Sequence, residues 1–249
     1  MSKLNVKLHY TYYILIISFL LTGQFLNIII ITMLILVHEL GHYMACVITK
    51  IKVKEIIIYP YGGITKINDV IDIPLGSEFV ISISGIIVQS LFYLGIFILY
   101  RNNIVREYSY LLFRKYHYTM LIFNLVFIYP LDGIKILNVF INKIFNYRLS
   151  NIIVIVISIV NIFVLFFCFK VNYSYVMIVS VLVSYIIDYV KNINYIYNRF
   201  LLEKYLYRKI YKRKRIIDNK NKMYRNTTHL VKYNKKYYKE DDFLRKIFD

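Results

Sequence analysis

The chain has 249 residues, of which 59% are hydrophobic, and carries a formal net charge of +18. Such a composition excludes an ordinary soluble domain and favours a polytopic membrane protein. Its two cysteines predict no disulfide framework. The charge is uneven, because residues 191–249 hold 18 Lys and Arg against 6 Asp and Glu. In a chain with membrane spans, this basic segment indicates contact with anionic lipid headgroups and not with nucleic acid.

The first two apolar runs predict helices over residues 10–21 and 25–48, the first of them a retained span. After a lysine-rich link, β-branched runs on either side of Gly62-Gly63 predict a hairpin over residues 53–67. A strand at membrane depth needs protein or a cavity beside it, so we expect the hairpin near the second helix. It would there offer an edge to an extended peptide, or be a plain interfacial loop.

The second apolar run contains His38-Glu39-Leu40-Gly41-His42, here termed the pentad. Histidines at i and i+4 on a helix face the same way, so both imidazoles can reach one ion, with Glu39 beside them. Ionisable side chains within a span are costly and usually functional, although hydrogen bonds to a neighbouring helix are the plainer alternative. The pentad predicts a zinc site, and catalytic zinc usually takes a third protein ligand and leaves one position for water.

A third span is predicted over residues 78–100, and the charged residues 101–115 argue against membrane insertion, so the fourth span should begin near residue 116. It should break at Tyr129-Pro130-Leu131-Asp132-Gly133, because proline lacks the backbone donor. Asp132 is the one acidic residue between Glu107 and Asp188, and it is the candidate third zinc ligand. Its alternative role is the N-cap of a helix over residues 133–145.

Two further spans are predicted over residues 149–169 and 173–190. Six spans place both termini on one side, which would hold 27 basic residues against 5 on the other. The positive-inside rule therefore predicts that both termini are cytoplasmic and that the pentad and Asp132 lie toward the same face. Residues 191–249 should form a basic cytoplasmic tail or a small remnant domain, beginning with a basic helix over 199–214. The expected fold is an all-α polytopic membrane protein with about six transmembrane helices and a small membrane-associated hairpin, its membrane domain spanning residues 1–190.

These motifs resemble those of the site-2-type intramembrane metalloproteases, and more narrowly the stage IV sporulation protein FB group. The pentad matches their zinc motif, and Tyr59-Pro60-Tyr61-Gly62-Gly63-Ile64 is similar to their Pro-Phe-Gly-Gly hairpin. Phe123-Asn124-Leu125 followed by Tyr129-Pro130-Leu131-Asp132-Gly133 is similar to their Asn-containing and Pro-Leu-Asp-Gly segments. The chain departs from the group where Phe127 replaces a proline, Ile134 replaces a glycine, and Gly85-Ile86 replaces Gly-Pro. Residues 191–249 are also too few for the pair of nucleotide-binding CBS motifs found in many members.

The resemblance implies that His38, His42 and Asp132 bind one zinc per chain and that Glu39 is the catalytic base. It further implies that Asn124 and Pro130 shape a substrate groove. The substrate would be a membrane-associated pro-protein, with a pro-sigma factor of sporulation as the suspected one, and membrane inhibitor proteins are further candidate partners.

The residues themselves favour peptide hydrolysis, with Glu39 accepting the proton of the attacking water. The alternative is a non-enzymatic metal carrier or sensor that uses the same ligands, and Glu39 discriminates between the two because binding alone does not require it. A structural scaffold would need neither metal nor Glu39.

Overall fold

The computed structural model describes residues 6–59, 62–67, 71–168, 173–233 and 236–248. The chain divides into two compact units, residues 1–69 with 80–125, and residues 70–79 with 126–249. The first unit contains β1 (Val6–Leu8), α1 (Tyr10–Leu21), α2 (Phe25–Ile48), β2 (Val53–Tyr59), β3 (Gly62–Ile67), most of α3 (Leu75–Arg101) and α4 (Glu107–Leu125). The second contains α5 (Asp132–Ile144), α6 (Tyr147–Cys168), α7 (Tyr173–Tyr207), β4 (Lys214–Ile217), the 3₁₀ turn η1 (Lys220–Lys222), β5 (Thr228–Tyr233), β6 (Lys236–Lys239) and α8 (Glu240–Phe248).

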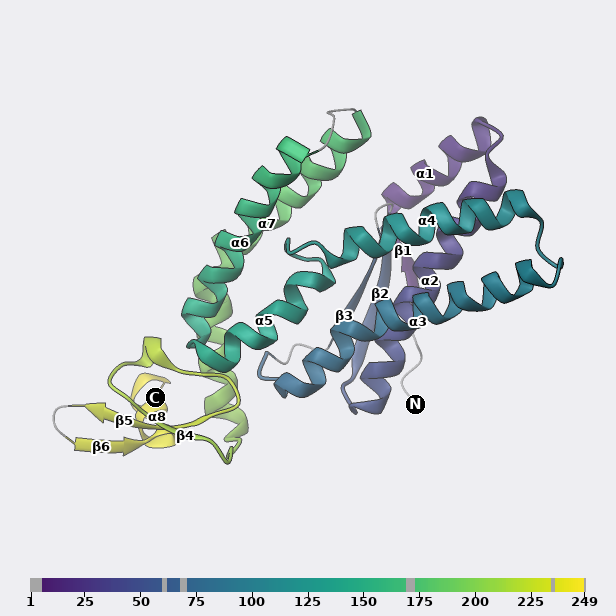
Figure 1. Ribbon diagram of the computed structural model, residues 1–249. Helices are drawn as coiled ribbons and strands as arrows, with labels where there is room; N and C mark the ends of the chain where they lie inside the picture. Colours follow the sequence, from purple (N-terminus) through teal and green to yellow (C-terminus); the bar gives the residue numbers. More distant parts are fainter. Residues whose placement is uncertain (1–5, 60–61, 68–70, 169–172, 234–235, 249) are drawn as a thin grey trace. The chain divides into compact units, whose positions relative to one another are not determined.

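In the first unit, the predicted hairpin forms and lies against α2 (Figure 1). β2 pairs antiparallel with β3, and β1 adds a parallel neighbour to β2, so β2 is the central strand. Buried Tyr12, Ile35 and Ile58 join α1, α2 and β2 in one apolar cluster. A second cluster of Ala45, Cys46 and Ile81 joins α2 to α3. These contacts hold the sheet and α3 against α2.

The second unit contains a small folded module at its C-terminal end, formed by β4, η1, β5, β6 and α8. β4 pairs parallel with β5, and β5 pairs antiparallel with β6. The module packs on the C-terminal half of α7 through a buried cluster that includes Phe200, Met223, Val231 and Leu244. Burying each such apolar side chain contributes about 1.5–3 kcal/mol, which explains how so basic a segment folds.

α7 and the module together hold the connector that leads into α3. The Glu203 carboxylate accepts hydrogen bonds from the backbone N–H groups of Ile71 and Asp72 at 2.7–3.1 Å. Arg225, whose side chain is only 4% exposed, forms an ion pair with Glu78 at 2.7 Å. The Glu78 carboxylate neutralises this buried guanidinium, which also donates a 3.1 Å hydrogen bond to the Ile73 carbonyl, so the module and the first turn of α3 are tied together within this unit.

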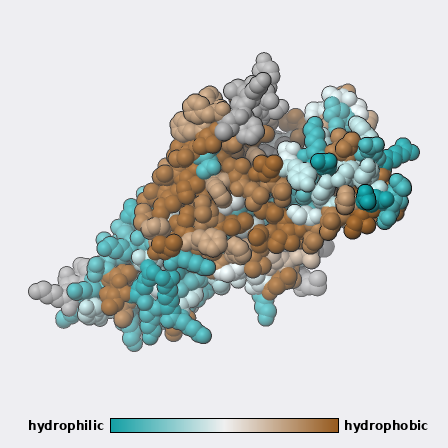
Figure 2. All heavy atoms as spheres, in the orientation of Figure 1, coloured by the Kyte–Doolittle hydropathy of each residue, from teal (hydrophilic) through white to brown (hydrophobic). Residues whose placement is uncertain are grey.

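Among the described residues, four helical segments are long and apolar enough to cross a membrane: Phe25–Ile48, Leu75–Arg101, Tyr147–Phe167 and Val176–Tyr207. Figure 2 shows exposed apolar side chains over α6 and α7, and a hydrophilic surface over the strands of the C-terminal module. α1 is apolar but has only 12 residues. The chain is therefore a membrane protein with a mostly helical fold, and the count of about six spans stays a prediction.

Two helices differ in extent from the segments predicted. α4 begins at Glu107, because polar residues such as Arg114 and Lys115 form a helix as readily as apolar ones do; the start of the membrane span near residue 116 stays a prediction. The basic helix expected over 199–214 ends at Tyr207, as the end of α7, and Lys214 already begins β4. The domain boundary predicted at residue 190 falls inside α7, which is continuous there. The boundary stays a prediction.

Candidate active site

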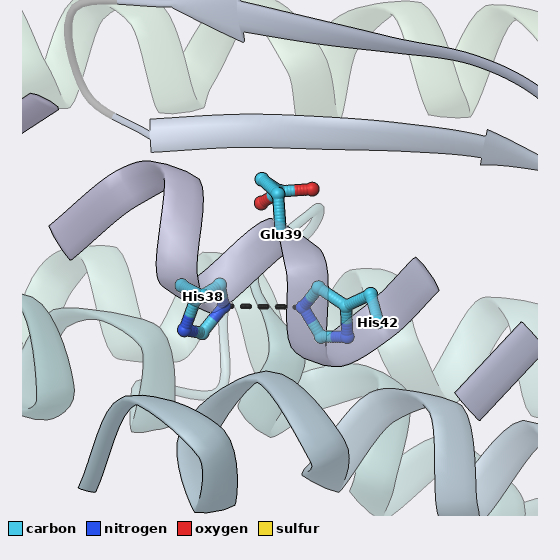
Figure 3. Close-up of side chains that lie close together, drawn as sticks. All are labelled: His38, Glu39 and His42. Carbon is cyan, nitrogen blue, oxygen red and sulfur yellow. Dashed lines mark hydrogen bonds between the residues drawn. The ribbon is translucent and has the colours of Figure 1, made fainter. Parts of the chain in front are cut away.

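The pentad lies in the C-terminal half of α2, and its three ionisable side chains are buried. His38, Glu39 and His42 are 2%, 3% and 6% exposed. Figure 3 shows the two imidazoles on one side of the helix and the Glu39 carboxylate on another. One ligand atom from each of the three residues can be chosen so that all lie within 4.8 Å of one another. The spacing predicted from the sequence is therefore realised as a compact group.

Hydrogen bonds to α3 orient both histidine rings. His42 Nδ1 lies 2.7 Å from the backbone carbonyl oxygen of Ile81, which can only accept a hydrogen bond. His38 Nδ1 lies 2.9 Å from Gln89 Oε1. A neutral imidazole that donates from Nδ1 presents a lone pair at Nε2. Both rings therefore direct a metal-binding nitrogen into the same space.

The distance between these two nitrogens fits a zinc ion. His38 Nε2 and His42 Nε2 are 3.1 Å apart. Two nitrogens at about 2.0–2.1 Å from a tetrahedral zinc would lie about 3.3 Å from each other. Two lone pairs this close repel each other unless a proton or a cation lies between them. The donor set present in the chain therefore suits a divalent metal ion.

Glu39 is held by the hairpin. The Thr65 hydroxyl, on β3, donates a 2.7 Å hydrogen bond to Glu39 Oε2. The strand passes so close to Glu39 that a Cβ on Gly63 would overlap the carboxylate, at 2.7 Å from Oε1. Glycine at this point allows β3 to approach Glu39. The carboxylate is thus buried beside the histidines and oriented by a neutral donor.

α3 approaches α2 closely on the histidine side. A Cβ on Gly41 would lie 2.6 Å from the backbone oxygen of Ser84, and one on Gly85 would lie 2.6 Å from His42 Nε2. The two helices can therefore contact only through glycines at these points. Gly85-Ile86 stands where the resembled group has Gly-Pro. Ile86 takes the place of the proline, and α3 is a continuous helix at this point.

The other predicted site residues lie elsewhere in the chain. Asn124 is in the last turn of α4, whereas Pro130 and Asp132 belong to the second unit. Asp132 is 3% exposed and 2.9 Å from Lys135 Nζ. α5 begins at Asp132 itself, one residue earlier than predicted, and its N-cap is Leu131, so the alternative role of Asp132 as the N-cap was wrong. Its role as a zinc ligand, and those of Asn124 and Pro130 in a groove, stay predictions.

Sequence reasoning missed the partners that orient the pentad. Gln89, Thr65 and the carbonyl of Ile81 were assigned no role in the site. Their contacts are tertiary, so no local spacing reveals them. The one available signal was that a long amide side chain lies within an apolar run.

Three comparisons with known proteins show what this chain is similar to. The model of peptidase family M50 matches residues 26–119, a range that contains the pentad, the hairpin and α3. Stage IV sporulation protein FB of Bacillus subtilis (strain 168) is 27% identical over 207 residues, which cover 81% of this chain and 72% of that protein. The site-2 protease from Methanocaldococcus jannaschii has a similar fold, with a TM-score of 0.60 and 21% identity over 76% of this chain and 91% of that one. The resemblance to site-2-type intramembrane metalloproteases, and among them to the stage IV sporulation protein FB group, is therefore confirmed.

Proposed function

We propose that this chain is a zinc metalloendopeptidase that hydrolyses a peptide bond of a membrane-associated pro-protein. Cleavage would occur at or near the cytoplasmic face of the membrane, with one zinc per chain. The observation that supports this most directly is the arrangement of the pentad. Two imidazole nitrogens 3.1 Å apart adjoin a buried carboxylate, in a chain that resembles membrane proteases.

The residues would divide the work as follows. His38, His42 and Asp132 would hold the zinc. When bound, the metal supplies Lewis-acid chemistry, which acidifies water and polarises the scissile carbonyl. Glu39 would accept the proton of the attacking water and pass it to the leaving amine. The hydrogen bond from Thr65 holds one carboxylate oxygen and so limits the orientations that Glu39 can adopt.

The substrate would bind in an extended form beside the hairpin. β2 is paired with a strand on each of its two edges. Within the described residues, β3 is paired with β2 alone. An extended peptide could add to the other edge of β3 and so come near Glu39, which contacts that strand. Asn124 and Pro130 would shape the same groove. A pro-sigma factor of sporulation is the substrate that the resemblance to stage IV sporulation protein FB favours, with membrane inhibitor proteins as regulators.

The rival function, a metal carrier or sensor, is less well supported. A carrier needs the metal ligands but gains nothing from a buried carboxylate that a threonine on a separate strand orients. Burying that carboxylate is costly, and catalysis gives a reason for the cost.

The decisive experiment separates catalysis from metal binding. Full-length wild type and the variants Glu39→Gln and Asp132→Asn are purified in detergent, zinc is measured by elemental analysis, and cleavage is measured on a co-expressed candidate pro-protein. Wild type should hold about one zinc. Glu39→Gln should keep its zinc and lose cleavage by at least about 10²-fold, because an amide cannot accept the proton. Asp132→Asn should retain zinc less tightly.

Glu55→Gln is the matched control. It makes the same chemical change to a carboxylate of the hairpin that pairs with Lys7 at 2.8 Å, and it should leave both zinc and cleavage unchanged. If Glu39→Gln loses its zinc, Glu39 is a ligand and its assigned role is wrong. If it cleaves normally, the cleavage does not depend on Glu39, and the proposed proteolytic site is wrong.

A further inference from the structure

A buried glutamine links three helices of the first unit at the pentad. Gln89 of α3 is 0% exposed. Its Oε1 lies 2.9 Å from His38 Nδ1 on α2. Its Nε2 lies 3.3 Å from the backbone oxygen of His117 on α4 and 3.2 Å from His117 Nδ1. Both ends of the amide are therefore engaged, each by a different helix.

These contacts determine which way the amide points. The carbonyl oxygen of His117 can only accept a hydrogen bond, so the NH₂ group of Gln89 must face α4. Its Oε1 consequently faces His38 and can only accept from Nδ1. The neutral imidazole carries one ring proton, so Nε2 of His38 is left as a lone pair that points toward His42.

α4 keeps its end of this chain of contacts rigid. The His117 ring stacks on Tyr93, with ring centres 4.3 Å apart and planes 4° from parallel. Tyr93 follows Gln89 by one helical turn, and its hydroxyl lies 3.0 Å from that of Tyr110. The acceptor that orients Gln89 is thus itself fixed by packing between α3 and α4.

We propose that Gln89 is a positioning residue of the metal site, which fixes the tautomer and ring orientation of His38; this inference rests on the proposed function. Metal-binding histidines usually donate their second N–H to a carboxylate, a backbone carbonyl or water. A carboxylate here would add a charge inside an apolar helix. Gln89 supplies the same acceptor without that charge, as the backbone carbonyl of Ile81 does for His42.

The plainer explanation is helix packing. Small residues serve that purpose in membrane helices, as Gly85 does on the same face of α3. A glutamine is long, and burying its polar amide is unfavourable unless the amide is hydrogen-bonded. Packing alone would therefore be served equally well by methionine, which has the same length and lacks the amide. This difference provides the test.

The test measures zinc affinity, and not activity, on the purified full-length chain in detergent. Zinc is titrated against a competing chelator in wild type, Gln89→Met and Gln89→Glu, and the absorption spectrum is recorded after Co²⁺ replaces zinc. Gln89→Met should bind zinc about 10- to 100-fold more weakly and alter the cobalt spectrum, because His38 loses its acceptor. Gln89→Glu loses the donor to the His117 carbonyl but keeps an oxygen facing Nδ1, so its affinity should exceed that of Gln89→Met and lie within about tenfold of wild type.

Ser90→Ala is the matched control, since it alters the neighbouring position of α3 and should leave affinity and spectrum unchanged. If Gln89→Met fails to fold, Gln89→Asn replaces it. That variant keeps the amide but withdraws its oxygen by one methylene, so it should also weaken zinc binding. Wild-type affinity and an unchanged cobalt spectrum in either folded variant would overturn the inference while leaving the proposed function intact. A wild-type chain that binds no zinc would overturn both.

Discussion

At the scale of single residues, the pentad depends on the absence of a side chain at Gly85. A methyl group there would lie 2.6 Å from His42 Nε2 and 2.8 Å from His38 Nε2. Gly85→Ala would therefore place a carbon atom where the ion should sit, or push α3 away from α2. We expect the variant to lose most of its zinc, which elemental analysis of the purified chain would measure.

Gly95→Ala is the control for this prediction. Gly95 lies on the same helix, and a Cβ there would meet nothing within 4 Å. Replacing glycine by alanine favours helix by about 1 kcal/mol at both positions, so helix propensity cannot account for a difference between them. Full zinc occupancy in folded Gly85→Ala would show that the ion binds away from the two Nε2 atoms.

The same scale shows what could be predicted about the site. The His-Glu-x-x-His spacing is local, so the sequence alone predicted the grouping of His38, Glu39 and His42. The contacts of Glu39 with Thr65, and of His38 with Gln89, join residues 26 and 51 positions apart. Spacing along the chain carries no information about such pairs until the packing of α2 against β3 and α3 is known.

At the scale of elements, the first and last residues of a helix were predicted well where polar residues end an apolar run. α1 and α2 have the predicted limits, because Thr22-Gly23-Gln24 and the lysines after Ile48 end the runs. The limits of α4 could not be predicted in this way. Hydropathy reports which residues tolerate lipid, whereas helix formation depends on backbone propensity, so the charged start of α4 was missed.

The strands of the C-terminal module were missed for a different reason. β4 and β6 have four residues each, Lys-Arg-Ile-Ile and Lys-Tyr-Tyr-Lys. Neither segment alternates apolar and polar residues, and both are too short to distinguish from a basic linker. What makes them strands is pairing with β5 and packing on α7, which are tertiary effects.

This module should lose stability in acid. His229, on β5, is fully buried; its Nε2 accepts a hydrogen bond from the backbone N–H of Tyr224, and its Nδ1 lies 2.9 Å from Glu240. Burial lowers the pKa of His229 below its ordinary value. Burial alone would raise the pKa of Glu240, but the hydrogen bond to His229 and the charge of Lys204 outweigh it and lower that pKa.

Both folded pKa values thus lie below the unfolded ones, so the unfolded module binds more protons. Its stability should be complete above about pH 6.5 and fall as the pH drops through the lowered pKa of His229, with a further loss below about pH 4.5 from Glu240. Hydrogen exchange at the β5 amides, corrected for intrinsic rates, should accelerate between pH 7.5 and 5.5. His229→Gln should remove this dependence. Protection that is constant over that range in the wild type would contradict the prediction.

At the scale of the whole molecule, the distribution of charge constrains how the chain lies in the bilayer. Four described helices are long and apolar enough to cross a membrane, and the 27 basic residues predicted for one side exceed the 5 on the other. Cytoplasmic loops carry the excess of Lys and Arg, so the C-terminal module should be cytoplasmic. The polar link after α3 should face outward, and the proposed site should open toward the cytoplasm.

This orientation can be tested with cysteines in a background where Cys46 and Cys168 are replaced by alanine. Asp218, in the C-terminal module, and Asn102, after α3, are both exposed. In intact cells, an impermeant thiol reagent should label Asn102→Cys and leave Asp218→Cys unlabelled, and both should react once the membrane is permeabilised. That second step shows that protection reflects the membrane and not burial in the fold. Labelling of Asp218→Cys from outside would reverse the orientation, and a cytoplasmic substrate could then not reach the site from the side proposed.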